Sequence, residues 1–146
     1  MKQIPERLLN IFRRYDTPTI LNSLELLDST FRTSCFTTEQ MICADTTLPP
    51  IVGYARTATI SASSEVDPNT KRDRSLAYYE YVSSGTAPFI SVIQDIDESP
   101  GFGAFWGEVN SNIHNALGVI GVVTNGSVRD LDVLSAGFQV LAGKIG

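Results

Sequence analysis

The sequence predicts an α/β fold in which helices flank a mainly parallel sheet, formed by a single domain over residues 1–146. One observation is the order of elements after residue 88, where short apolar runs typical of buried strands alternate with helical segments. Another is the composition, since 42% of the 146 residues are hydrophobic and 18% are charged. That balance is typical of a folded domain long enough to bury a sizeable core.

Two helices and a long loop are expected in the first third of the chain. Residues 5–14 carry apolar side chains at helical spacing. A second helix is expected over 17–27, with Thr17 as its N-cap and Pro18 in the first helical position. Residues 29–50 are rich in Thr, Ser and Pro and are predicted to be mostly loop.

The middle of the chain reads as strand, helix and strand with polar connections. Residues 51–62 are β-branched and partly alternating, which favours a strand. The polar residues 63–74 are expected to form an exposed loop, and 75–84 a helix. Residues 88–96 have the pattern of a buried strand, and the glycine-punctuated residues 98–107 form a loop after it.

A helix over 108–117 follows that loop. Its predicted apolar face repeats at i, i+4, i+7 and i+8 and consists of Val109, Ile113, Ala116 and Leu117. Gly118 is expected to end this helix, because glycine adopts the left-handed conformation common at helix C-termini.

The last residues supply two further strands. The apolar residues 119–124 are predicted to be a strand, and Asn125-Gly126 to be a turn. Residues 131–136 suggest one or two helical turns, and 138–143 a further strand. This succession is that of βαβ units, which place parallel strands in one sheet beneath helices.

Composition excludes several classes of partner. The net charge is −5 with only 11 Lys and Arg, which argues against a nucleic-acid partner. Cys35 and Cys43 are not spaced as a CxxC pair, and with one histidine they cannot form a zinc ligand set. They are interpreted as reduced thiols of a cytoplasmic protein. No signal peptide and no apolar run of the ~18 residues that a membrane span needs is found.

Three charged residues enclose an uncharged segment near the end of the chain. Glu108 opens the helix at 108–117, and Arg129 and Asp130 follow the strand at 119–124. The helix is about 15 Å long and the strand about 18 Å. Because the helix runs down and the strand runs back, the twenty residues between Glu108 and Arg129 return the chain to its starting level. The charges are therefore expected to meet at the sheet edge where α/β folds bind ligands.

That edge would combine groups suited to an oxo-acid and a metal. The amides at 107–110 lie at a helix N-terminus, where they favour an anion. Arg129 can bind a carboxylate bidentately. Glu108 and Asp130 offer hard oxygen ligands suited to Mg²⁺ or Mn²⁺.

The same residues also have simpler interpretations. Arg129 and Asp130 could form a surface turn with a weak ion pair. Glu108 could only stabilise the N-terminus of its helix, which is worth up to about 1 kcal/mol. His114 is interpreted as a solvated or capped histidine rather than a base, and Trp106 as a packing residue at the junction of loop and helix.

Residues 105–132, FWGEVNSNIHNALGVIGVVTNGSVRDLD, resemble the signature of the RraA-like family. This family includes the class II, metal-dependent 4-hydroxy-4-methyl-2-oxoglutarate (HMG/CHA) aldolases. Those aldolases carry an acidic residue, twenty residues and then Arg-Asp, the spacing of Glu108 and Arg129-Asp130 here. Weaker similarity at 51–57, 84–92 and 136–143 extends the resemblance from about Asp16 to the end.

The resemblance implies a swivelling β/β/α layered fold assembled as a homotrimer or a dimer of trimers, with sites near subunit interfaces. It also implies roles for the residues at the predicted edge. Arg129 would be the catalytic residue and would bind the pyruvyl group. Asp130 would bind the metal directly, and Glu108 would bind it through water. A substrate carboxylate would be held by the backbone amides of Gly107, Glu108, Val109 and Asn110.

The activity implied is cleavage of 4-hydroxy-2-oxo acids to pyruvate, dependent on Mg²⁺ or Mn²⁺, with oxaloacetate decarboxylation as a companion. The general base would be a water polarised near Arg129. A Schiff base is disfavoured because the lysines lie outside this edge. The alternative is a non-catalytic family member that binds ribonuclease E. A quinone methyltransferase is not favoured, since no acidic ribose-binding residue follows the glycine-rich loop at the usual spacing.

Two positions depart from the family pattern. Asn125 stands where family members usually have Asp, which could change a turn or a hydrogen bond. The family also usually continues for several strands beyond the position of Gly146. The sequence is therefore expected to be either a partial chain or a shortened relative.

Overall fold

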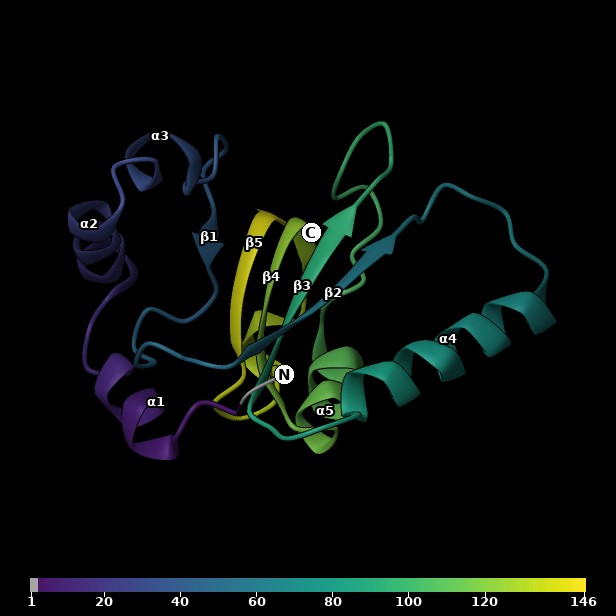
Figure 1. The fold of residues 1–146 in the computed structure, drawn as a ribbon. Helices are drawn as coiled ribbons and strands as arrows, with labels where there is room; N and C mark the ends of the chain where they lie inside the picture. Colours follow the sequence, from purple (N-terminus) through teal and green to yellow (C-terminus); the bar gives the residue numbers. More distant parts are fainter. Residues whose placement is uncertain (1–2) are drawn as a thin grey trace.

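The computed structural model describes residues 3–146, and its centre is a five-stranded sheet with the strand order β1-β5-β4-β3-β2 (Figure 1). Strands β2 to β5 run parallel, and the short β1 pairs antiparallel with β5. The mainly parallel α/β fold predicted from the sequence is thereby confirmed. The strands are β1 (Ile42–Cys43), β2 (Tyr54–Ile60), β3 (Phe89–Asp95), β4 (Val119–Val128) and β5 (Gln139–Ile145).

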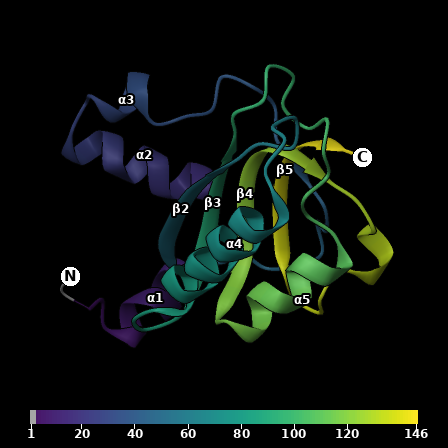
Figure 2. The same cartoon turned by 90° about the vertical axis from the view of Figure 1, so that its right-hand side faces the viewer.

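Helices lie on both sides of this sheet. Figure 2 shows α4 and α5 in front of one face, whereas α1 to α3 lie on the opposite side of the sheet, at its left in Figure 1. The α-helices are α1 (Glu6–Phe12), α2 (Thr17–Leu27), α3 (Phe31–Ser34), α4 (Pro68–Ser83) and α5 (Glu108–Ala116), and a 3₁₀ turn covers Leu131–Val133.

The hydrophobic core lies between the central strands and the two covering helices. Strands β3 and β4 contribute Phe89, Val119 and Val122, which are almost completely buried beside Trp106 from the loop before α5. Helix α4 adds only one fully buried residue, Val82. Burial of a side chain of this size contributes about 1.5–3 kcal/mol, so Val82 is the main hydrophobic anchor of α4, whereas α5 buries the polar residues Ser111 and His114.

Strand β4 does not end where the sequence suggested, and the predicted turn at Asn125-Gly126 is wrong. The strand continues to Val128 through an irregularity in its pairing with β5 between Thr124 and Ser127. The amide group of Asn125 takes the place of a backbone pair: its Oδ1 accepts from Asp95 N at 2.7 Å, and its Nδ2 donates to Asp95 O at 2.9 Å. A side chain that satisfies the neighbouring strand in this way removes the need for a turn.

Helix α4 begins well before the predicted start at residue 75. Asp67 caps it by accepting from the amides of Asn69 and Thr70, and Pro68 occupies the first turn. The first half of the helix is polar on every side and leans away from the sheet (Figure 1). The predicted exposed loop at 63–74 is therefore helical from residue 68 onward.

The first helices are largely exposed and are held by local polar contacts. Asp16, not Thr17, is the N-cap of α2, since its side chain accepts from Thr19 N at 2.9 Å. Helix α2 has no buried residue, and Leu26 and Leu27 at its end are 89% and 84% exposed.

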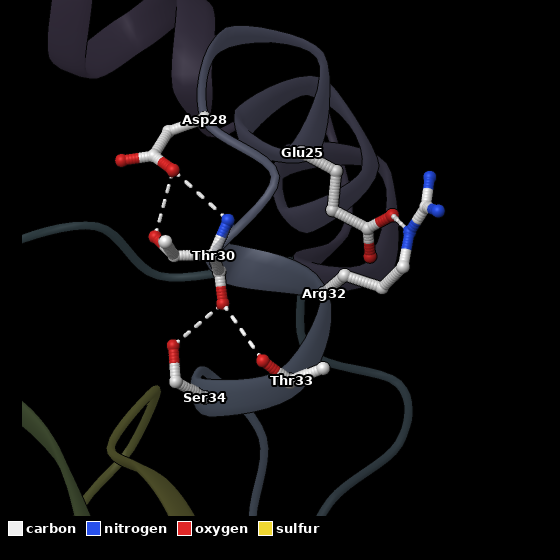
Figure 3. Close-up of polar contacts among 6 residues, drawn as sticks. All are labelled: Glu25, Asp28, Thr30, Arg32, Thr33 and Ser34. Atoms are coloured by element: carbon white, nitrogen blue, oxygen red, sulfur yellow. Dashed lines mark hydrogen bonds and ion pairs between the residues drawn. The ribbon is translucent and has the colours of Figure 1, made fainter.

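The connection from α2 to α3 is a network of short-range hydrogen bonds (Figure 3). Asp28 accepts from the amide and the hydroxyl of Thr30 at 2.9 and 2.8 Å. Arg32 forms an exposed ion pair with Glu25 at 3.4 Å. The predicted loop at 29–50 is mostly loop, with α3 and β1 as short additions.

A buried carboxylate joins the ends of β2 and β3. Asp97 accepts hydrogen bonds from the Ser61 hydroxyl, the Ser63 hydroxyl and the Ala62 amide. These bonds, with that from Ser61 the strongest, lower the pKa of Asp97 from its ordinary value of 3.8 to about 2. Asp95 in turn accepts from the amides of Asp97 and Gly101. The loops after β2 and β3 are thus tied together at the carboxyl edge of the sheet.

Candidate functional site

The loop before α5 is fastened to the carboxyl end of β4. Trp106 forms a parallel bridge with Val128, and Arg129 N donates to Trp106 O at 2.9 Å. This contact sets the first turn of α5 beside the residues that follow β4. The predicted meeting of these two segments is observed, although β4 is four residues longer than the strand from which it was predicted.

Asp130 lies against the N-terminus of α5. Its Oδ2 is 3.4 Å from the amide of Glu108 and 3.6 Å from Nε of Arg129. The Arg129 and Asp130 side chains are 61% and 42% exposed, so an ion pair at this distance contributes little to stability. Asp130 is the one non-glycine residue with positive φ in residues 3–146, at φ 56° and ψ 42°. Residues held in such conformations are concentrated at functional sites.

Gly107 is where the two segments come closest. A Cβ atom added to Gly107 would lie 2.6 Å from Asp130 Oδ2 and 3.0 Å from Arg129 Cγ. Its own backbone is extended, with φ −175°, so the absence of a side chain reflects close contact. The sequence marked Gly107 only as an amide donor, and the need for a bare Cα beside Asp130 was missed.

Gly107, Glu108, Arg129 and Asp130 lie together at this edge of the sheet, which we call the rim. The first turn of α5 presents backbone amides to the rim. Within residues 3–146, the amides of Val109 and Asn110 have no acceptor, and that of Glu108 has only the long contact to Asp130. Unpaired amides at a helix N-terminus favour an anion. Asn110 Nδ2 donates to Phe105 O at 2.6 Å, which keeps that side chain turned back onto the loop.

The buried face of α5 differs from the predicted apolar face. Val109 is 66% exposed, whereas Ser111 and His114 are completely buried. His114 Nδ1 lies 2.7 Å from Asn110 O, and its Nε2 lies 2.9 Å from the Tyr78 hydroxyl. Burial lowers the pKa of His114. The histidine is capped by these bonds and is not solvated.

Trp106 packs where the sequence placed it, at the junction of loop and helix. Its ring centroid is 4.6 Å from that of His114 and 5.9 Å from that of Phe138, with which it stacks. The tryptophan thereby fixes the loop that carries Gly107 and gives the rim a rigid support.

The acidic residues at the rim fit a hydrated divalent ion better than a fully protein-bound one. Within residues 3–146, no group of three His, Cys, Asp or Glu side chains could hold a metal. The Asp130 carboxylate makes only long contacts, so it is free to bind a cation. Mg²⁺ retains several waters and needs only one or two carboxylates. The residues present fit such an ion.

Two hollows of the surface lie elsewhere. One lies between α4 and the sheet, and the other lies over the opposite face of β2 to β4. Neither is lined by Glu108, Arg129 or Asp130. The predicted site is an open rim of a single chain.

Comparison with known proteins identifies the family. The profile of the RraA-like family, described as aldolase/RraA, matches residues 17–145. The chain belongs to the RraA-like family. No curated protein matches this RraA-like chain.

Solved structures share its fold at low sequence identity. Streptomyces coelicolor RraAS2, an unusual member of the RNase ES inhibitor RraA protein family, has a TM-score of 0.68 and 17% identity over 99% of this chain. A protein from a crystal structure of novel cellulases of gut-associated microbes has a TM-score of 0.68 and 15% identity, also over 99%. The RraA-like chain spans 66% and 62% of these two chains, respectively.

In the part of the chain that the structure describes, no helix is both long and apolar enough to span a bilayer.

Proposed function

We propose that this RraA-like chain is a divalent-metal-dependent lyase that cleaves 4-hydroxy-2-oxo acids of the 4-hydroxy-4-methyl-2-oxoglutarate type to pyruvate. Decarboxylation of oxaloacetate is its companion activity. The observation that carries the proposal is the contact of Arg129 and Asp130 with the first turn of α5. A guanidinium, a carboxylate and unpaired amides are thereby available to one small oxo-acid.

Each group has a separate role in the proposal. The amides of residues 107–110 bind one substrate carboxylate, and Arg129 binds the pyruvyl carboxylate and keto oxygen. Asp130 would bind Mg²⁺ or Mn²⁺ directly, and Glu108 would bind it through water. When bound, the ion would supply a Lewis acid for the keto oxygen.

The bond changes require little more than charge stabilisation. The 4-hydroxyl proton passes to a water near Arg129, the C3–C4 bond breaks, and C4 is released as a carbonyl. The electron pair of that bond stays on the pyruvyl fragment, which becomes an enolate. The enolate oxygen faces the positive charge of Arg129. Protonation at C3 then gives pyruvate. Loss of CO₂ from oxaloacetate produces the same enolate.

The open rim also supports an assembly in which a second copy completes the site. Arg129 and Asp130 are exposed in the single chain, whereas catalytic groups act best where water is excluded. We propose a cytoplasmic homotrimer, or a dimer of trimers, with the rim at a subunit interface. Sedimentation velocity tests this assembly, and a monomer at all concentrations would contradict it.

Pyruvate release coupled to lactate dehydrogenase tests the activity. The assay is run with 4-hydroxy-4-methyl-2-oxoglutarate and with oxaloacetate, in Mg²⁺, in Mn²⁺ and after EDTA. The expected result is pyruvate formation that EDTA abolishes and added metal restores. No metal-dependent pyruvate from either acid would overturn the proposal.

A second candidate is a regulator that binds ribonuclease E without catalysis. It is favoured by the shared fold with RraAS2, which belongs to an RNase inhibitor family. Binding to purified ribonuclease E, measured with wild type and the Arg129→Ala variant, separates the two candidates. A regulator binds whether or not metal is present, and it releases no pyruvate.

A further inference from the structure

The hollow between α4 and the sheet is a second region with the composition of a ligand site. Its volume is about 780 Å³, within the range of small-molecule pockets. It lies where the first half of α4 leans away from β2 and β3 (Figure 1). None of Glu108, Arg129 and Asp130 lines it, so it is distinct from the candidate metal rim. We call it the α4 cavity.

The floor of the α4 cavity is apolar and partly aromatic. Side chains from β2, β3, α4 and the glycine loop form it, namely Ile60, Ile93, Tyr78, Tyr79 and Phe105. Such a floor favours the flat apolar body of a ligand, because ring faces and branched side chains gain from burying each other.

Two cations stand on the wall of the cavity that α4 provides. Lys71 and Arg74 both line it, and they share one face of the helix with Ser75 and Tyr78 at i, i+3, i+4 and i+7. Neither forms an ion pair with any side chain in residues 3–146. The intervening Arg72 does not line the cavity. A polar helix face that directs two unpaired cations over an apolar floor is suited to an organic anion.

The Tyr78 ring is held in a defined position at the cavity floor. His114 Nδ1 donates to Asn110 O at 2.7 Å, so its Nε2 accepts from the Tyr78 hydroxyl at 2.9 Å. The Tyr78 oxygen also lies 3.5 Å from the hydroxyl of Ser91. Because His114 and Ser91 are completely buried, the Tyr78 hydroxyl is satisfied within the core and anchors the ring that lines the cavity.

Two carboxylates, Asp95 and Glu65, also line the cavity. The two oxygens of Asp95 accept from the amides of Asp97 and Gly101. Within residues 3–146, neither carboxylate forms an ion pair with Lys71 or Arg74, so both cations remain available to a ligand carboxylate.

We propose that the α4 cavity binds a small aromatic carboxylate, with the ring on the apolar floor and the carboxylate between Lys71 and Arg74. This binding is independent of the lyase activity proposed for the rim.

The test is a titration of the ¹⁵N-labelled full chain followed by amide chemical shifts. The probe is 4-hydroxybenzoate, with neutral 4-hydroxybenzamide and inorganic phosphate as controls for charge and for ring. We expect 4-hydroxybenzoate to shift amides of residues that line the cavity, and both controls to bind at least about threefold more weakly. The proposal would be overturned if the neutral amide bound equally well. It would also be overturned if 4-hydroxybenzoate bound with a Kd weaker than about 10 mM.

Charge-removing variants locate the binding. Lys71→Gln and Arg74→Gln are each expected to weaken 4-hydroxybenzoate binding by about threefold or more. The matched control Arg72→Gln, on the same helix but outside the lining, stays within about twofold. An equal loss in all three variants would show attraction by the charge of the helix as a whole, which contradicts a defined site.

A further variant separates this site from the rim. Arg129→Ala leaves 4-hydroxybenzoate binding unchanged, and a loss there would place the probe at the rim instead.

Discussion

Substitution of Gly107 by alanine tests the candidate rim without removing any charge. The added Cβ would lie 2.6 Å from Asp130 Oδ2 and 3.0 Å from Arg129 Cγ. A carbon and an oxygen in contact are no closer than about 3.3 Å, so the Asp130 carboxylate must move by about 0.7 Å or more. The extended backbone of Gly107 accepts alanine without strain, and the displaced groups are exposed. Little loss of stability is therefore expected.

The expected effect on function is large, because a misplacement of about 1 Å at a reacting centre can cost about 100-fold in rate. For Gly107→Ala we expect pyruvate release to fall about 10- to 100-fold and the Mg²⁺ dependence to shift to higher concentration. The assay is coupled pyruvate release at varied Mg²⁺, with thermal melting measured in parallel.

Gly137→Ala is the matched control. Gly137 has φ +74°, and an added Cβ there meets nothing within 4 Å. This variant carries backbone strain of about 1–2 kcal/mol and should melt earlier, yet retain its rate and its metal dependence. Wild-type turnover and Mg²⁺ dependence in Gly107→Ala would refute the role assigned to the rim.

Four further substitutions test particular contacts. Arg129→Ala should lower turnover by about 100-fold or more, whereas the remote control Arg32→Ala should not, and equal rates would refute the role of Arg129. Asp130→Asn should weaken Mg²⁺ binding at least about tenfold, which calorimetry measures, and an unchanged titration would argue against ligation. Asn125→Ala loses both bonds to the backbone of β3, and Tm should fall by about 2–4 °C for about 1 kcal/mol; an unchanged Tm would show that the strand pairs without them. The depressed pKa of Asp97, about 2 against 3.8, stabilises the fold fully above about pH 4, and this is lost as pH falls through about 2. Asp97→Asn should therefore flatten the acid dependence of Tm, and parallel wild-type and variant curves would exclude this linkage.

The elements that the sequence predicted well are those whose side chains are sorted by burial. Strands β3 and β4 are short apolar runs, and α5 is closed by Gly118, which has φ +85°. The first half of α4 has no apolar period because no side chain there is buried, so periodicity could not detect it. A local signal was nevertheless present: Asp67 followed by Pro68 has the cap chemistry of a helix start.

The site was predictable in its backbone and less so in its surroundings. The succession of a helix and a parallel strand predicts that Glu108 and Arg129 meet at one edge, although the predicted strand stopped four residues before the end of β4. The same succession cannot show that Ser111 and His114 would occupy the buried face of α5, because their hydrogen bonds to Ser135 and Tyr78 come from distant elements. The prediction of a turn at Asn125 was wrong for a similar reason, since the partner of its side-chain amide is 30 residues away in β3.

The exposure of α2 has a consequence for motion. A short helix without a buried face depends on its own cap and hydrogen bonds, and isolated helices shorter than about 12–15 residues are marginal in water. We expect the amides of α2 to exchange with deuterium far sooner than those of β3 and β4, as the least protected cooperative unit of the chain. An aliphatic partner seated on Leu26 and Leu27 would slow that exchange selectively and leave the protection of the central strands unchanged.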